Sequence, residues 1–379
     1  MKKLLVLLFI FLLPVLSFAD NKIDKAVNYL MKEMNTYYDK NCAASECSIT
    51  NDIITSFQNA YKCSINNDYS LKNKVSNDLS NIGDGERLGD VLSSALASIY
   101  YRYYNTSFLL INDQKYIKNL NKNMLNEFYT DEQNNKYVLT LYDEKDNMYK
   151  NTLKINLSLY VLKAYAAYRY NLDEFFKIST PVFNNIIAEY KPYINKEDYN
   201  YYFNLYNEYK DKHNIIKKFF ISNYLSSDNK NYSSMKTHEK IKKIVYDAVF
   251  FMEDKDILLK QLNELNLKDI EKLEQSENYY YKNLYLIAKT ALGEKEKLLN
   301  DNSFTDKDIY LKLRINALYL QSLIVSNSKK TDIKKQYNII DSLLENSKNQ
   351  LNNDYNSKKV NYDYYKIYKE YISTLQGDI

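Results

Sequence analysis

Glycine and proline are almost absent from this chain, and their scarcity limits its possible folds more than any other feature. The chain has 379 residues, with five glycines and three prolines, and Pro14 lies in the first apolar run. A body built of β-strands needs many tight turns, and these two residues supply the backbone angles for most of them. The composition therefore predicts an all-α fold, in a chain long enough to bury a large core.

The strongest helical pattern lies in residues 148–190. In its first half, apolar residues recur at helical spacing on two opposite faces, one formed by Leu153, Leu157, Tyr160, Val161, Ala164 and Tyr168 and the other by Ile155, Leu159, Leu162 and Ala166. A narrow polar stripe of Asn156, Lys163 and Arg169 separates the two faces. We expect neighbouring helices to cover such a helix on two sides.

The same periodicity predicts about fifteen helices joined by short links. Residues 137–142 read as an extended connector, and Pro181 is expected to kink one helix or to begin another. Gly293 is expected to end a helix, and Thr305 and Thr331 are expected to cap the next two. In the second half of the chain, the predicted helices span residues 197–210, 215–225, 239–252, 256–265, 279–292, 306–324, 332–351 and 362–375.

Such a series predicts a multi-helix α/α array, either a solenoid-like or superhelical stack of antiparallel helix pairs or a closed ring. Residues 283–299 (NLYLIAKTALGEKEKLL) resemble one tetratricopeptide helix pair. The resemblance covers one pair only, and the repeat of roughly 34 residues and the aromatic signature of that family are missing. It therefore supports a class of architecture and no particular family.

Residues 226–235 contain the most loop-like segment, SSDNKNYSS. We predict a linker there, between an N-terminal helical region at 20–225 and a C-terminal one at 236–379. The alternative that both regions form one continuous body stays open.

Residues 1–19 have the three parts of a secretory signal peptide. Lys2 and Lys3 precede an apolar run at 4–16, and Ser17 and Ala19 are the small residues that cleavage requires. The run is shorter than the roughly 20 residues of a membrane span, although an uncleaved anchor is the alternative. No later run is apolar enough to cross a bilayer, so we expect a soluble, exported protein, periplasmic or secreted.

Three cysteines follow the leader and would face an oxidising compartment. A predicted helix at 49–61 places Cys47 and Cys63 about 20 Å apart, whereas a disulfide needs Cα atoms within about 7 Å. We therefore predict a Cys42–Cys47 disulfide, with Cys63 left as a buried thiol or an intermolecular partner. No metal site is predicted, because neither histidine lies nearby in the sequence.

The charge pattern argues against nucleic-acid binding. The formal net charge is +4, and only four of the 52 basic residues are arginines, interleaved with 48 acids. Nucleic-acid-binding proteins usually show a basic stripe instead. The 41 tyrosines are spread over nearly every predicted helix. They read as core residues with a polar tip, or alternatively as an aromatic surface for sugars or proteins.

Few catalytic groups are available. His213 (KDKHN) and His238 (KTHEK) both lie in polar stretches and are predicted to face solvent. No serine-hydrolase, zinc-protease or nucleotide-binding motif is present, and no cofactor is predicted.

Carboxylates offer the remaining catalytic route, because two of them suffice for glycoside cleavage. The two acidic clusters in connectors are Asp143, Glu144 and Asp146, and Asp84, Glu86 and Asp90. Acids also gather at helix N-termini for purely electrostatic reasons. The first cluster lacks the alternating ligands and the glycine of a calcium loop.

The leading hypothesis is a non-catalytic, exported protein-binding or scaffold module of the cell envelope or secreted fraction. The alternative is a carbohydrate-active or sugar-binding α/α-ring protein that uses the carboxylates above. A third reading is an envelope component that self-associates through Cys63.

That third reading predicts a covalent dimer on non-reducing gels of the exported protein. Reduction should convert it to monomer, and Cys63→Ser should abolish it because the odd thiol forms the bridge. Cys42→Ser is the matched control. A dimer that persists in Cys63→Ser would assign the bridge to another cysteine.

Overall fold

The computed structural model of the protein describes residues 22, 25–26, 28–29, 32, 154, 157–158, 160–165, 167–168, 171, 173–223, 225, 232–250, 255–299, 308–326 and 328–376. All regular elements in these residues are helices, which confirms the all-α prediction for this part of the chain. They are α8 (Asp173–Tyr190), η3 (Lys191–Tyr193), α9 (Lys196–Ser222), η4 (Tyr232–Ser234), α10 (Thr237–Val249), α11 (Lys255–Asn263), α12 (Lys268–Glu271), α13 (Gln275–Ala291), α14 (Ile309–Val325), α15 (Lys330–Asn356) and α16 (Tyr364–Gln376). None of the described helices is both long and apolar enough to span a membrane.

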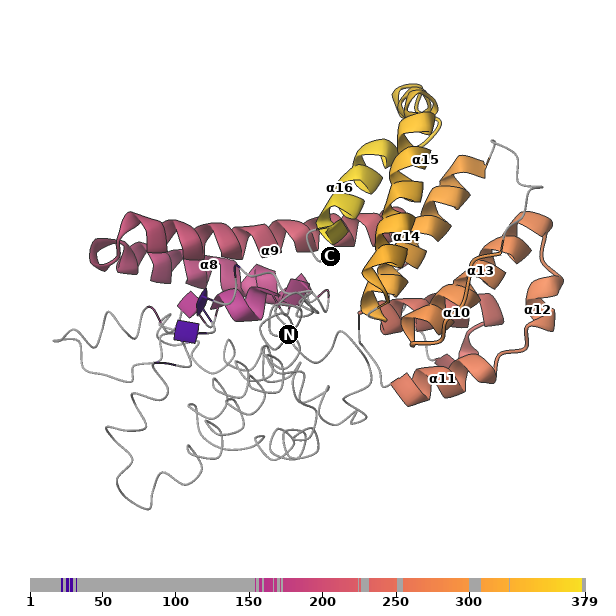
Figure 1. The fold of residues 1–379 in the computed structure, drawn as a ribbon, viewed down its shortest axis with the longest axis horizontal. Helices are drawn as coiled ribbons and strands as arrows, with labels where there is room; N and C mark the ends of the chain where they lie inside the picture. Colours follow the sequence, from indigo (N-terminus) through magenta and orange to yellow (C-terminus); the bar gives the residue numbers. More distant parts are fainter. Residues whose placement is uncertain are drawn as a thin grey trace, which may run out of the picture.

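Helix α14 lies among the C-terminal helices and packs against α13, α15 and α16 (Figure 1). Its buried residues lie on every side of the helix, which requires cover on every side. They are Ile309, Leu313, Ile315, Ala317, Leu318, Leu320, Gln321, Ser322, Leu323, Ile324 and Val325. The C-terminal core is therefore organised around α14.

Helices that follow one another in the chain pack side by side, as the predicted α/α array requires. Contacts join α13 to α14, α14 to α15, and α15 to α16, and α10 packs against α13. Helix α15 runs antiparallel to both neighbours: Gln336 Nε2 donates to Asn316 Oδ1 over 2.8 Å, and Lys369 Nζ donates to Asp341 Oδ1 over 2.6 Å.

The C-terminal end of α9 joins the α8–α9 pair to the remaining helices (Figure 1). Phe219 stacks on Tyr371 of α16 with ring centroids 3.6 Å apart and planes 2° apart. Phe220 lies 5.7 Å from Tyr246 of α10 and 4.8 Å from Phe250, and its ring also meets that of Tyr371 edge-on at 6.5 Å. Two adjacent side chains of α9 therefore pack against two other helices, α16 and α10.

The prediction of two helices at 197–210 and 215–225 is wrong, because α9 is one helix of 27 residues. The polar run KDKHN suggested a turn between them. In the structure, Tyr209, His213 and Ile216 lie on the buried face, whereas Asp211 and Asn214 are exposed. A polar run inside an amphipathic helix needs no turn when its polar residues fall on the solvent side.

The described residues between 154 and 168 are helical and covered on both predicted faces. Leu157 and Val161 on one face and Leu162 on the other have no exposed surface. The predicted polar stripe is wrong at Lys163, which is 1% exposed. The stripe residues Asn156 and Arg169 lie outside the described residues, as does the predicted connector at 137–142.

Two predictions about helix ends are resolved, and a third is wrong. Helix α8 continues through Pro181, and Gly293 ends α13 with a positive φ of 90°, where its N–H donates to the carbonyl of Thr290. Thr331 does not cap α15, because it lies inside a helix that begins at Lys330. Thr305 lies outside the described residues.

Residues 294–299 are not helical, so the resemblance of 283–299 to a tetratricopeptide helix pair does not hold in the structure. This segment runs back along α13 instead. The Leu299 N–H donates to Asn283 Oδ1 over 3.0 Å, and Tyr279 donates to the Leu299 carbonyl over 2.9 Å. Tyr319 of α14 donates to the Glu296 carbonyl over 2.8 Å. The returning segment thus lies against both α13 and α14.

The α9 junction predicts a large difference between two nearby positions of one helix. Phe219 is fully buried and should cost about 3–5 kcal/mol of unfolding free energy when changed to Ala, because the stacked ring leaves a cavity. Ile221 is 48% exposed, so Ile221→Ala should change stability by no more than about 0.5 kcal/mol. Urea unfolding followed by circular dichroism measures both. Equal losses of unfolding free energy in the two variants would contradict a stabilising role for the buried Phe219 ring.

Candidate functional site

The site residues predicted from sequence fall in the part of the chain that the structure does not describe. They are Cys42, Cys47 and Cys63, the carboxylates Asp84, Glu86 and Asp90, and the carboxylates Asp143, Glu144 and Asp146. The predicted disulfide and the carboxylate route therefore remain predictions. Within the described ranges, no group of three or more His, Cys, Asp or Glu side chains could hold a metal ion.

The prediction that His213 faces solvent is wrong. The side chain is 1% exposed, its ring lies 4.9 Å from the ring of Phe176, and neither ring nitrogen has a hydrogen-bond partner. Burial lowers the pKa of His213 to about 4, and the neighbouring Asp173 opposes this shift only in part. His213 is therefore a neutral core residue near pH 7. His238 lies partly exposed on the first turn of α10.

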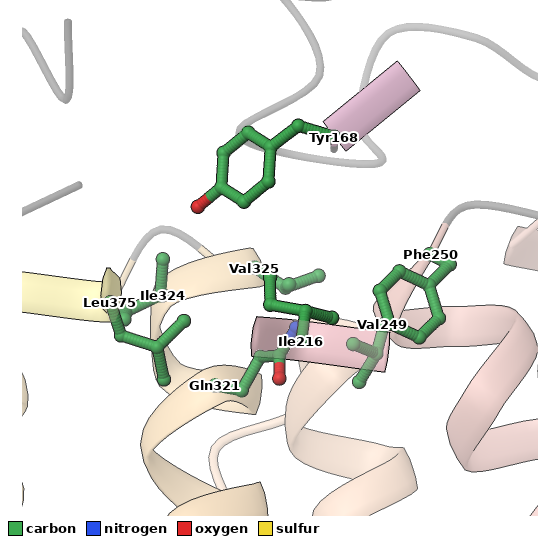
Figure 2. Close-up of a pocket in the computed structure, with 8 residues that line it drawn as sticks. All are labelled: Tyr168, Ile216, Val249, Phe250, Gln321, Ile324, Val325 and Leu375. Atoms are coloured by element: carbon green, nitrogen blue, oxygen red, sulfur yellow. The ribbon is translucent and has the colours of Figure 1, made fainter. Parts of the chain in front are cut away.

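A small cavity lies where five helical segments meet (Figure 2). The cavity lining consists of Tyr168, Ile216, Val249, Phe250, Gln321, Ile324, Val325 and Leu375. The volume open to the centre of a water-sized sphere is about 10 Å³. That is room for roughly one water molecule, which Gln321 could bind through Oε1, a buried atom without a hydrogen-bond partner. The cavity is far too small for a sugar or a cofactor.

Three exposed or partly exposed aromatic side chains lie in the turn between α8 and α9 and on the first turns of α9. We call Lys191, Tyr193, Tyr199 and Phe203 the hairpin patch. Tyr193 is 49% exposed and Phe203 is 37% exposed. The rings of Tyr199 and Phe203 stack with centroids 5.9 Å apart and planes 10° apart, and Lys191 Nζ lies 5.7 Å from the Tyr199 ring centroid. Large aromatic side chains left exposed together mark a binding surface more often than scattered ones do.

The patch rests on a firmly packed pair of helices. Below it, Tyr206 of α9 stacks on Phe183 of α8, with ring centroids 4.0 Å apart and planes 9° apart. The hydroxyl groups of Tyr206 and Ser179 are hydrogen-bonded over 2.5 Å. At the turn, Asn195 Oδ1 accepts from the Asp198 N–H over 2.7 Å and so caps α9. The aromatic side chains of the patch are therefore presented by a rigid support.

Ion pairs on the first turn of α9, next to the hairpin patch, connect this helix to earlier parts of the chain. Asp198 on the first turn of α9 accepts from Lys25 Nζ over 2.6 Å and pairs with Lys154 Nζ at 3.5 Å. Burial acts to raise the pKa of the Asp198 carboxyl, but the two lysines outweigh it and the pKa is lowered. Asp198 is thus a charged carboxylate held in place by two cations.

Sequence reasoning missed the hairpin patch because tyrosine occurs in nearly every helix of this chain. A tyrosine count cannot tell which rings reach solvent. The available signal was Pro192 next to Tyr193, since proline ends a helix and places its neighbours at an exposed turn.

Comparison of the chain with known protein families finds no match, and neither curated proteins nor solved structures show a significant similarity to it.

Burial of His213 predicts a specific loss of stability in acid. The unfolded histidine binds a proton near pH 6.5 and the folded one only near pH 4, so the unfolded state binds more protons between these values. Stability should fall by about 3 kcal/mol from this residue alone as pH drops through that window, and no further below it. His213→Leu should remove this part of the slope.

The measurement is urea unfolding of the wild type, His213→Leu and the control His238→Leu at intervals between pH 7 and pH 3.5. The carboxylates contribute equally to all three proteins, so the difference in slope isolates His213. Parallel curves for wild type and His213→Leu would contradict the assignment.

Proposed function

We propose that the protein is an exported, non-catalytic protein-binding module whose contact surface includes the hairpin patch. The proposal rests on one observation, the stacked and partly exposed rings of Tyr199 and Phe203 on α9, together with the exposed ring of Tyr193 in the turn before that helix.

The chemistry of the patch suits a protein partner. Tyrosine rings provide a large contact area with few rotatable bonds, and they are enriched among the residues that dominate binding energy at interfaces. The lysine above the Tyr199 ring adds a cation at the edge of the aromatic surface. The partner we expect offers apolar or aromatic side chains framed by polar groups.

A sugar ligand is the second candidate, because the flat faces of exposed tyrosines also stack on sugar rings. The same patch would then bind a glycan, and the carboxylates predicted from sequence would supply any catalysis. The two candidates differ in which ligand the patch retains.

The test compares a patch variant with a matched control. Peptides are selected from a random displayed library on the immobilised full chain, and their affinities are then measured in solution by fluorescence polarisation. Tyr193→Ser/Phe203→Ser should weaken the selected peptides by about tenfold or more, because the rings are contact residues. The control, Leu267→Ser/Ile339→Ser, replaces apolar side chains of similar exposure, 38% and 39%, elsewhere on the surface. It should bind like the wild type.

A glycan panel is run in parallel with the same three proteins. Selected peptides that bind all three equally, or the absence of any selected peptide, would contradict protein binding through the patch. A glycan that binds the wild type and the control but not the patch variant would support the sugar-binding alternative.

A further inference from the structure

Four exposed lysines lie close together at the start of α15. We call Lys329, Lys330, Lys334 and Lys335 the lysine patch. Residues 329–335 contain these four lysines and a single acid, so the net charge of the stretch is +3. The patch covers the N-cap and the first two turns of the helix, a length of roughly 10 Å.

The helices around the patch do not neutralise its charge. Within the described residues, Lys329, Lys334 and Lys335 make no ion pair. The next two acids along α15 already pair with Lys369 of α16, at 2.6 and 2.9 Å. The ammonium groups of these three lysines therefore face solvent without a counter-charge from the described helices.

This arrangement is electrostatically unfavourable for the protein alone. The N-terminal end of a helix carries roughly half a positive charge, and cations near it destabilise the helix. Lys330 and Lys334 are four residues apart, so their like charges occupy neighbouring positions on the helix surface. The N-cap residue, Lys329, forms no capping hydrogen bond through its side chain. An anionic partner would compensate these costs.

A stretch of α10 with the same charge differs in its surroundings. Residues 236–243 (KTHEKIKK) also contain four lysines and one acid. There Lys243 pairs with Asp247 at 2.9 Å, and Lys240 and Lys242 lie over tyrosine rings, 5.1 and 5.6 Å from the ring centroids. These three lysines are only partly exposed. The fold thus uses the lysines of α10 internally, whereas those of the lysine patch are left on the surface.

We propose that the lysine patch docks the protein onto an anionic membrane surface, with lipid phosphate groups as the counter-charges. Clusters of four or more basic residues on a helix are typical of such contacts. Lysine suits this role because its ammonium is a mobile point charge, whereas directed recognition of one carboxylate or base usually uses the planar fork of arginine. Ile339, one turn after Lys335 and 39% exposed, adds an apolar side chain beside the charges.

A membrane fits the lysine patch better than an acidic peptide does. Each exposed ion pair strengthens binding by less than about fivefold, and a peptide must be ordered to form all four at once. An anionic bilayer presents mobile headgroups over the whole contact area, so the lysines need no fixed partners. The patch lies on α15, away from the α8–α9 turn, and the inference does not rest on the proposed function.

The test measures co-sedimentation with lipid vesicles. It uses the chain from Asp20, because the apolar run of the predicted leader would itself bind lipid. Anionic vesicles contain equal parts of phosphatidylcholine and phosphatidylglycerol, and vesicles of phosphatidylcholine alone are the neutral match.

Two variants lose the same net charge. The patch variant carries Lys329→Gln, Lys330→Gln, Lys334→Gln and Lys335→Gln. The control carries Lys218→Gln, Lys260→Gln, Lys268→Gln and Lys297→Gln, which replace exposed lysines that make no ion pair within the described residues.

The wild type and the control should bind the anionic vesicles alike. The patch variant should bind about a hundredfold more weakly, since each lysine near an anionic surface contributes about fivefold. Raising the salt concentration should release the wild type, because exposed charges are screened. Equal binding of the wild type and the patch variant, equal losses in both variants, or equal binding of the wild type to neutral vesicles would overturn the proposal.

Competition separates a membrane from soluble anions. A hexaglutamate peptide or glycerol phosphate should displace the wild type from anionic vesicles no better than sodium chloride does at matched ionic strength. Stronger displacement by either would assign the lysine patch to that soluble ligand and overturn the proposal.

Thermal unfolding separates docking from structural support. The melting temperature of the patch variant should stay the same or rise, because its lysines oppose the helix dipole. A lower melting temperature than that of the control would mean that the lysines stabilise the fold, and would overturn the argument from uncompensated charge.

Discussion

The end of α9 is the interaction on which the described structure depends. Phe219 and Phe220 are adjacent on one helix. Phe219 packs against α16, and Phe220 packs against both α16 and α10, which are far apart in the sequence. Burying two such rings removes a large apolar area from water. Asn223 then closes the helix end, donating to the Phe219 carbonyl over 2.8 Å and accepting from Arg314 and Tyr368. Apolar and polar contacts thus both stabilise the C-terminal end of α9.

Tyrosine does much of the packing that leucine and phenylalanine do in other proteins. The largest fully buried side chains include Tyr168, Tyr190, Tyr202, Tyr206, Tyr209, Tyr368 and Tyr371. A buried hydroxyl is stable only when it finds a partner. Tyr202 and Ser158 are hydrogen-bonded over 2.9 Å, and Tyr364 donates to the Ser222 carbonyl over 3.0 Å. These bonds join different helices, so the tyrosines set the register of the core as well as fill it.

Much of the helical fold could be predicted from the sequence, and the errors share a cause. Apolar spacing located α10, α13 and α16 to within a few residues, because the buried face of each helix repeats every three or four positions. The same reasoning wrongly predicted a turn within α9 at KDKHN and wrongly predicted that Lys163 and His213 face solvent. It assigned polar residues to the surface by residue type alone. Neighbouring helices cover both side chains in the structure. The hairpin patch lay beyond prediction, since only packing defines which of its side chains are exposed.

The sequence by itself determined that the described part of this chain is helical. Scarce glycine and proline leave few turns, and periodic apolar residues supply the faces to be buried. The tertiary structure decided which faces meet and which side chains remain without a partner. Local spacing fixes the direction of a side chain around its own helix axis. The environment that the side chain meets depends on helices from elsewhere in the chain, and for this reason Arg314 lies among tyrosines instead of acids.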